Sequence, residues 1–237
     1  MRVLRRRVAG AALAVAALLT ACVSPLPTPP SSSADAPSLP EPPAGGQRWR
    51  ADPAGSQLRL LVFRGGRAAA LGHNHVLTAP HWDGWLWLPA PEALAQGRAA
   101  LQLRLDALQI DAAAERAALG PAFARQPSAA DIAGTRANML SERGLDALRY
   151  PTVNVEVEGL QGEGGHWAAA LRITLHGQQR RYWVPVRIEP EGKAWRVRLE
   201  LALAQSDFGL QPFSVLGGLL AVQDVLQLRA ELRFVPA

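Results

Sequence analysis

Apolar and polar residues alternate over most of the chain beyond residue 47, and this period of two constrains the fold most. Leu101, Leu103 and Leu105, for example, are separated by polar residues. Such alternation is typical of antiparallel strands that have one buried and one solvent-facing side. The pattern recurs in five later segments, which are 153–158, 167–176, 182–188, 195–203 and 226–234.

Three earlier segments add strands to this pattern. The segments 57–63 and 82–88 are apolar on both faces, which predicts strands covered by other parts of the protein, and a run near 68–78 adds one more. Eight or nine strands in sequence predict an all-β fold, an antiparallel up-and-down β-barrel of about eight strands. A barrel of this size either fills itself with side chains or encloses one small ligand, and the sequence leaves both open.

One segment, 112–149, breaks the alternation because it is rich in Ala, Glu and Arg. Ser128 is a favourable N-cap residue, so we expect a helix from about residue 129 to residue 141. The apolar residues of this segment allow it to lie over the sheet or across one end of the barrel. The predicted fold therefore contains one helical insertion.

The charge balance argues against a nucleic-acid partner. The chain has 25 Lys and Arg residues against 20 Asp and Glu residues, a formal net charge of +5. Four of the basic residues lie within the first seven positions, and without them 21 basic residues face 20 acidic ones, a net of +1. A basic groove is therefore not predicted.

The N-terminus has the three parts of an export signal. Residues 1–7 are positively charged, residues 8–18 form an apolar run too short to span a membrane, and small residues precede Cys22. The ending resembles the bacterial lipoprotein box, in which the cysteine is acylated and becomes the mature N-terminus. Cys22 is the only cysteine, and Val23 follows it rather than Asp. We therefore expect a signal peptide at 1–21 and lipidation at Cys22, on the periplasmic side of a bacterial membrane, the outer rather than the inner one.

Proline and serine dominate the segment that follows Cys22. Eight prolines lie between residues 24 and 46. Such a composition favours extended, polyproline-like chain and cannot bury a core. The sequence thus predicts three parts: a signal peptide at 1–21, a lipidated cysteine with a tether at 22–46, and a barrel domain at 47–237. The lipid anchor would make the membrane a partner of the protein.

Several short motifs follow one another in the barrel region. They are Leu-Asp-Ala-Leu-Gln-Ile-Asp at 105–111, a Tyr-Pro pair within 145–155, Leu-Arg-Ile-Thr-Leu-His-Gly at 171–177, Tyr-Trp-Val-Pro-Val at 182–186 and Ser-Asp-Phe-Gly-Leu at 206–210. In order and spacing they resemble the YceI-like family, periplasmic or secreted lipocalin-like barrels associated with polyisoprenoid binding. The resemblance implies a lipocalin-like barrel that sequesters or carries a long apolar ligand, a polyisoprenoid or another fatty lipid.

Ligand contacts are expected at the mouth of such a barrel, where a few polar groups orient a mainly apolar molecule. The apolar stretch 208–222 contains two consecutive glycines and is predicted to plug or gate one mouth. The candidate ligand-binding residues are His73, Asn74, His75, Phe208 and Phe213.

A metal site is the alternative use of the histidines. His73 and His75 are two residues apart, so on a strand their side chains point the same way. With His81 and Asp83 close in sequence, they have residue types that hold Zn²⁺ or another transition metal. This alternative makes the protein metal-binding and leaves a catalytic role open.

Catalysis is otherwise not predicted. The chain has no Gly-x-Ser-x-Gly motif, and no cysteine remains free once Cys22 is lipidated. The Asp-Phe-Gly at 207–209 lacks the other motifs of a protein kinase. We therefore expect no catalytic residues and no cofactor. A second alternative is an interaction module with a solid core and no ligand.

Overall fold

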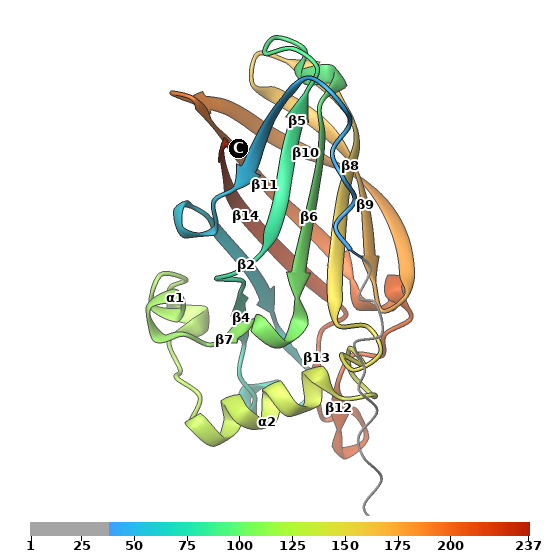
Figure 1. Cartoon of the computed structure of the whole chain (residues 1–237). Helices are drawn as coiled ribbons and strands as arrows, with labels where there is room; N and C mark the ends of the chain where they lie inside the picture. Colours follow the sequence, from blue (N-terminus) through green and yellow to red (C-terminus); the bar gives the residue numbers. More distant parts are fainter. Residues whose placement is uncertain (1–37) are drawn as a thin grey trace, which may run out of the picture. The chain divides into compact units, whose positions relative to one another are not determined.

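The computed structural model describes residues 38–237, and these form a closed antiparallel barrel (Figure 1). The barrel strands follow the order β1-β5-β6-β8-β9-β10-β11-β14, and β14 closes the ring by pairing with β1. The predicted all-β barrel of about eight strands is confirmed. The eight strands are β1 (Gln47–Ala51), β5 (Asp83–Leu88), β6 (Arg98–Arg104), β8 (Thr152–Glu163), β9 (His166–Leu175), β10 (Gln178–Glu191), β11 (Ala194–Ala204) and β14 (Val225–Pro236).

The sheet branches at β14. One edge of β14 pairs with β11, whereas the other edge pairs first with β2 (Gln57–Val62) and then with β1. From β2 the sheet continues to β4 (His75–Thr78) and β7 (Gln109–Ile110). These three strands form an extension beside the closed barrel. A separate small sheet has the order β12-β13-β3, made of Ser214–Val215, Leu220–Val222 and Arg64–Gly65.

Helical segments are few and mostly short. The predicted helix is α2 (Ala129–Leu140), and Ser128 caps it in a capping box with Asp131. In Figure 1, α1 (Ala113–Ala117) lies to the left of the lower part of the barrel, beside β4, and α2 lies below the barrel. Within the described part of the chain, no helix has the length and apolarity needed to cross a membrane. The 3₁₀ turns are η1 (Pro53–Gly55), η2 (Ala69–Leu71), η3 (Leu94–Gln96), η4 (Leu105–Ala107), η5 (Pro121–Phe123), η6 (Gln205–Phe208) and η7 (Leu216–Gly218).

Two predicted strands are shorter than expected. The run near 68–78 forms a strand only over β4, because η2 and a loop occupy its first half. The alternation through Leu105 ends one residue early, since η4 starts there. In the second case Leu105 is buried on the turn, whereas Leu71 on the first turn is 70% exposed.

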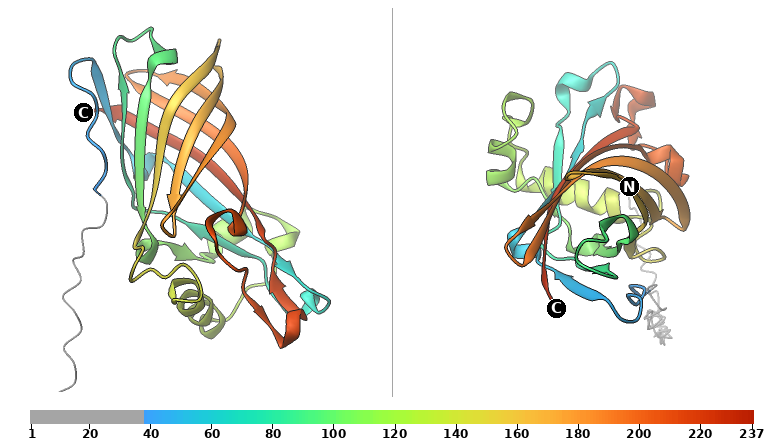
Figure 2. Two further views of the ribbon diagram at one scale, coloured as in Figure 1. Left: turned by 90° about the vertical axis from the view of Figure 1, so that its right-hand side faces the viewer. Right: turned by 90° about the horizontal axis from the view of Figure 1, so that it is seen from above.

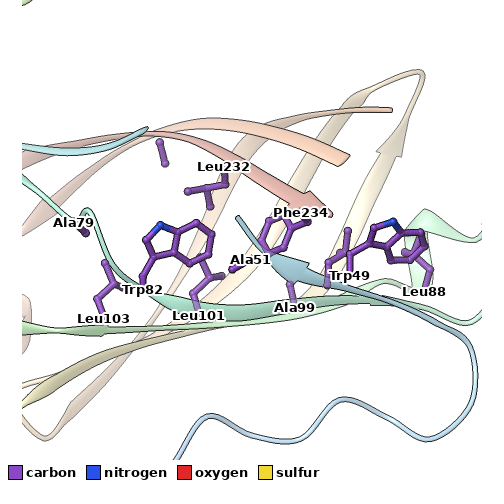
Figure 3. Close-up of a cluster of buried hydrophobic side chains, with 12 residues drawn as sticks. Trp49, Ala51, Ala79, Trp82, Leu88, Ala99, Leu101, Leu103, Leu232 and Phe234 are labelled. Atoms are coloured by element: carbon purple, nitrogen blue, oxygen red, sulfur yellow. The ribbon is translucent and has the colours of Figure 1, made fainter. Parts of the chain in front are cut away.

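Two apolar clusters fill much of the barrel and contain the inward-facing residues that the alternation predicts. The first joins β1, β5, β6 and β14 (Figure 3), and the second joins β9, β10 and η6. Fully or nearly fully buried members include Leu88 in the first cluster and Val184 and Phe208 in the second. The core therefore lies inside the closed barrel, and a smaller cluster under the extension joins Leu61, Val76 and Phe123.

The chain ahead of β1 lies along the outer side of β5. The indole of Trp85 donates a hydrogen bond to the carbonyl of Pro40, and that of Trp87 donates to Gly45. The last part of the predicted tether thus contacts the barrel. The predicted signal peptide, Cys22 and the earlier tether residues lie outside the described residues and stay predictions.

Candidate functional site

The inner face of the barrel is apolar and only partly buried. Three valines of β8 and three apolar residues of β11 contact both barrel clusters, yet each keeps part of its surface exposed. Residues at the centre of a filled core are normally sealed from water on all sides. The inner face therefore offers apolar surface that a ligand can cover. These six residues are Val153, Val155, Val157, Trp195, Val197 and Leu199.

Two buried indole N–H groups inside the barrel have no hydrogen-bond partner among the described residues. They belong to Trp82 and Trp167. Trp82 is 5% exposed and packs edge-on against Phe234, with ring centroids 5.9 Å apart. A buried donor without an acceptor costs about 1–3 kcal/mol. Neither N–H has solvent-accessible surface, so each is satisfied only by an acceptor that enters the packing around its indole.

The lower end of the barrel is closed by Phe208. This residue follows β11 on η6, is fully buried and belongs to the second cluster. Its carbonyl lies 3.3 Å from Nδ1 of His176, and the hydroxyl of Tyr182 donates to Asp207 at 2.9 Å. Burial and this hydrogen bond raise the pKa of Tyr182 to about 12, so the phenol stays protonated.

Phe208 and Phe213 are both predicted ligand contacts, but the structure separates them. Phe208 points into the barrel cluster, whereas Phe213 is 48% exposed on the loop that leaves the barrel. The stretch 208–222 therefore acts as a plug only through its first residues. Its remainder forms β12, η7 and β13 outside the barrel.

The histidines belong to a different place, the extension of β2, β4 and β7. His75 begins β4, and its Nδ1 lies 2.6 Å from Oδ2 of Asp111. Asp111 follows β7 with a positive φ of 56°, which turns its side chain under β4. The other carboxylate oxygen accepts from the backbone N–H of Val76 at 3.0 Å and from Arg116 at 2.5 Å.

This network around Asp111 is almost completely buried. The side chains of Asp111 and Arg116 are 0% and 2% exposed. Burial alone raises the pKa of Asp111, but hydrogen bonds from His75, Val76 and Arg116 outweigh it and hold the pKa below its usual value. The guanidinium of Arg116 also lies over the ring of Phe123. The network fastens α1 and η5 to the extension.

Asn74 and His73 stand at the edge of this network. The side chain of Asn74 accepts from the backbone of Arg64 at 3.0 Å and donates to the carbonyl of Ala122 at 2.9 Å. The two hydrogen bonds of the Asn74 side chain thus hold two loops together. The ring of His73 lies 6.2 Å from that of His75, and burial lowers its pKa.

The four-residue metal cluster does not assemble. His81 and Asp83 are exposed at the start of β5, while His75 is paired with Asp111. Across residues 38–237, no group of three or more His, Cys, Asp or Glu side chains is placed to hold a metal ion. The sequence spacing is suitable, but β4 pairs with β2 and β7 whereas β5 pairs with β1 and β6, so the two pairs of residues belong to different parts of the sheet.

The residues that sequence reasoning missed are Asp111, Arg116 and the two indoles. Asp111 is the last residue of the motif at 105–111, but nothing in the sequence indicates that it is buried. Trp82 precedes a strand and Trp167 lies on the inward face of one, so packing alone explains their residue type. Only the absence of a nearby acceptor among the described residues distinguishes them.

Comparison with known proteins identifies the fold. No family model matches the sequence, and neither does any curated protein. The crystal structure of BcnA from Burkholderia cenocepacia is similar, with 15% identity, a TM-score of 0.56 and coverage of 77% of this chain and 98% of that chain. A polyisoprenoid binding domain from Saccharophagus degradans has 11% identity, a TM-score of 0.51 and coverage of 80% and 98%.

A mutant YCEI protein of Campylobacter jejuni matches more weakly, with 10% identity, a TM-score of 0.48 and coverage of 66% and 82%. The two stronger likenesses show a shared fold and agree with the lipocalin-like barrel that the sequence predicts. At these identities they show the fold alone.

Proposed function

We propose that this protein is a lipid-anchored periplasmic binding protein that sequesters or carries a long apolar molecule inside its barrel. The observation that carries the proposal is the inner face, where apolar side chains that contact both clusters stay partly exposed; each cluster also has an indole N–H without an acceptor among the described residues. The proposed activity is binding, for which no reacting group is required.

The ligand class follows from the lining. Covering apolar surface gains about 25 cal/mol per Å², so a long alkyl or prenyl chain is favoured over a polar metabolite. Because Trp82 and Trp167 can each donate one hydrogen bond, we expect the ligand to carry an oxygen acceptor at one point along the chain. A polyisoprenoid or a related lipid meets both conditions, and the similar Saccharophagus degradans domain is described as polyisoprenoid binding.

The periplasmic location and the anchor rest on the sequence of residues 1–46. An export signal ending at Cys22 supports lipidation, and the proline-rich segment supports a tether. The hydrogen bonds from Trp85 and Trp87 to the end of this segment support a tether that leaves the barrel at a fixed place beside β5.

Native mass spectrometry tests the binding. The chain carrying Cys22→Ser, purified from bacteria without added ligand, should show an extra mass that organic extraction removes. Val197→Phe should fill the inner face and lower the bound fraction at least tenfold. Ala202→Phe, on the same strand but exposed outward, is the matched control and should retain the ligand.

Two results would overturn the proposal. One is a bare polypeptide that also fails to take up added prenyl or fatty lipid. The other is an increment matching a metal ion, removed by a chelator, in place of the organic mass.

A further inference from the structure

Five large apolar side chains are exposed together below the barrel. Leu71 is 70% exposed on η2, and the other four lie on the loop from Phe213 to Leu219. In Figure 2 this loop projects beyond the closed barrel as the hairpin of β12 and β13. We call these residues the apolar tip; they are Leu71 (70%), Phe213 (48%), Val215 (38%), Leu216 (71%) and Leu219 (44%).

The apolar tip is held in place by backbone pairing. Val215 pairs with Leu220 across the hairpin, and Val222 pairs with Arg64 of β3. The N–H of Ala68 donates to the carbonyl of Leu219 at 2.8 Å. Gly66 has a φ of +84°, and a Cβ there would lie only 2.4 Å from the same carbonyl, so glycine is required for the close approach. The exposure is therefore built into the fold.

Arginines surround the apolar tip. Arg64 donates to the carbonyl of Gly72 at 2.9 Å, and Arg125 donates to that of Ala70 at 3.3 Å, on either side of Leu71. Arg67 is exposed next to Ala68, which is bonded to Leu219. Arg64 bonds to carbonyls rather than to carboxylates, so its positive charge is not neutralised by these contacts, whereas the charge of Arg125 is partly balanced by Asp131.

Exposed apolar patches of this kind mark interaction sites, and the surrounding charge selects the partner. We propose that the apolar tip inserts into the surface of a lipid bilayer with anionic headgroups, while Arg64, Arg67 and Arg125 contact the headgroup phosphates. Leucines and phenylalanine suit the interfacial region of a bilayer, and each nearby arginine adds attraction to an anionic surface.

The position of the apolar tip in the fold agrees with this partner. The loop leaves the barrel directly after Phe208 and Leu210, which close the lower end of the second cluster. Insertion of the tip would bring that end of the barrel to the lipid surface. This inference goes beyond the proposed ligand binding and does not depend on lipidation of Cys22.

A label at the tip tests the inference directly. With Cys22→Ser and Leu216→Cys, the full chain has one thiol, which takes a polarity-sensitive fluorophore. Its emission should shift to the blue with vesicles of equal phosphatidylglycerol and phosphatidylcholine, and less with phosphatidylcholine alone. The matched control is Trp183→Cys, at a site 60% exposed on β10 that should show no shift.

Substitutions measure the contributions of the two kinds of residue. Leu216→Ser with Leu219→Ser should lower the binding of the full Cys22→Ser chain to anionic vesicles at least tenfold. Arg67→Gln should lower it about fivefold on anionic vesicles and leave binding to neutral ones unchanged. Equal shifts at positions 216 and 183, or no shift at either, would overturn the inference.

Two further readouts distinguish membrane insertion from self-association and from ligand binding in the barrel. Sedimentation of a dimer that Leu216→Ser converts to a monomer would assign the tip to self-association and overturn membrane insertion. Native mass spectrometry of the tip variants should show unchanged ligand, since the tip lies outside the barrel. If the chain holds no ligand but the emission of the label at position 216 still shifts with anionic vesicles, the proposed ligand binding is refuted and membrane insertion of the apolar tip is supported.

Discussion

The inside of the barrel and the extension beside it use polar groups in opposite ways. Inside the barrel, Trp82 and Trp167 have buried donors that no described residue accepts from. In the extension, Asp111 accepts from His75, Val76 and Arg116 and is fully buried. Asp111 is thus fully paired, although Nε of Arg116 has no partner among the described residues. A polar network of this kind rigidifies a fold, whereas the two indole donors have no such partners. The comparison agrees with a structural role for the histidine region and with the binding that we propose for the barrel.

The largest expected effect is the loss of the network in the extension. Asp111→Ala leaves the guanidinium of Arg116 buried without its carboxylate, so the free energy of unfolding should fall by about 3–5 kcal/mol in urea denaturation. Asp106→Ala is the matched control, because that carboxylate pairs with Arg104 at the surface and its loss should cost about 1 kcal/mol or less. Equal losses in the two variants would contradict the comparison.

The same network predicts how stability depends on pH. The folded pKa of Asp111 lies below its usual value, so its ionised form stabilises the fold above the unfolded pKa of about 4. That contribution is lost as the pH falls through the folded pKa. The free energies of unfolding of wild type and Asp111→Asn should therefore converge between pH 7 and pH 2. A constant difference would show that the carboxylate is not ionised in the fold.

Inside the barrel, removing a donor should cost much less. Trp82→Phe keeps an aromatic ring and removes the unpartnered N–H, whose penalty of about 1–3 kcal/mol offsets the packing lost with the larger ring. The free energy of unfolding of the ligand-free protein should therefore change by about 1 kcal/mol or less in urea denaturation. Its ligand should be held about tenfold more weakly, measured by native mass spectrometry. Trp85→Phe removes an N–H that is bonded to Pro40, so it should lower stability slightly and leave the ligand bound. Unchanged ligand retention in Trp82→Phe would remove the indole from the binding site.

The smallest effect is expected on the outer face of the barrel. Glu231 pairs with Arg196 and Arg198 at 2.8 and 3.3 Å, but these side chains are 19–44% exposed. Glu231→Gln should therefore change the free energy of unfolding by about 1 kcal/mol or less, and 1 M salt should abolish the difference. A loss that persists in high salt would mean that this surface is as tightly coupled as the extension.

The strands were predictable because alternation depends only on which neighbours face the core. The run around Leu232 and the helix that begins after Ser128 both follow local rules of this kind. Which strands pair with one another does not follow such local rules. The branch of the sheet at β14 could therefore not be predicted from the sequence. For the same reason, the sequence identifies Asp111 only as a residue of a turn. Its contact with His75 arises from the pairing of β4 with β7.

Apolarity alone also misplaced part of the candidate site. Phe208 and Phe213 lie in one apolar stretch, and only the first faces the barrel. The hairpin of β12 and β13 directs Phe213 outward, and its pairing with β3 is a contact between residues far apart in the chain. A sequence pattern shows that a side chain is apolar, but not which part of the protein, if any, it packs against.

The branched pairing of β14 also determines when this protein can finish folding. β14 is synthesised after every other strand of the barrel, and it supplies the partner for β11, β2 and β1 together. Until it leaves the ribosome, three strands have unpaired edges and the ring cannot close. A chain with so many contacts between distant residues folds slowly. Until the ring closes, its unpaired strand edges can pair with other chains and aggregate. Late closure of this kind would suit passage through a secretion channel in the unfolded state, the route expected if residues 1–21 are the export signal that the sequence predicts.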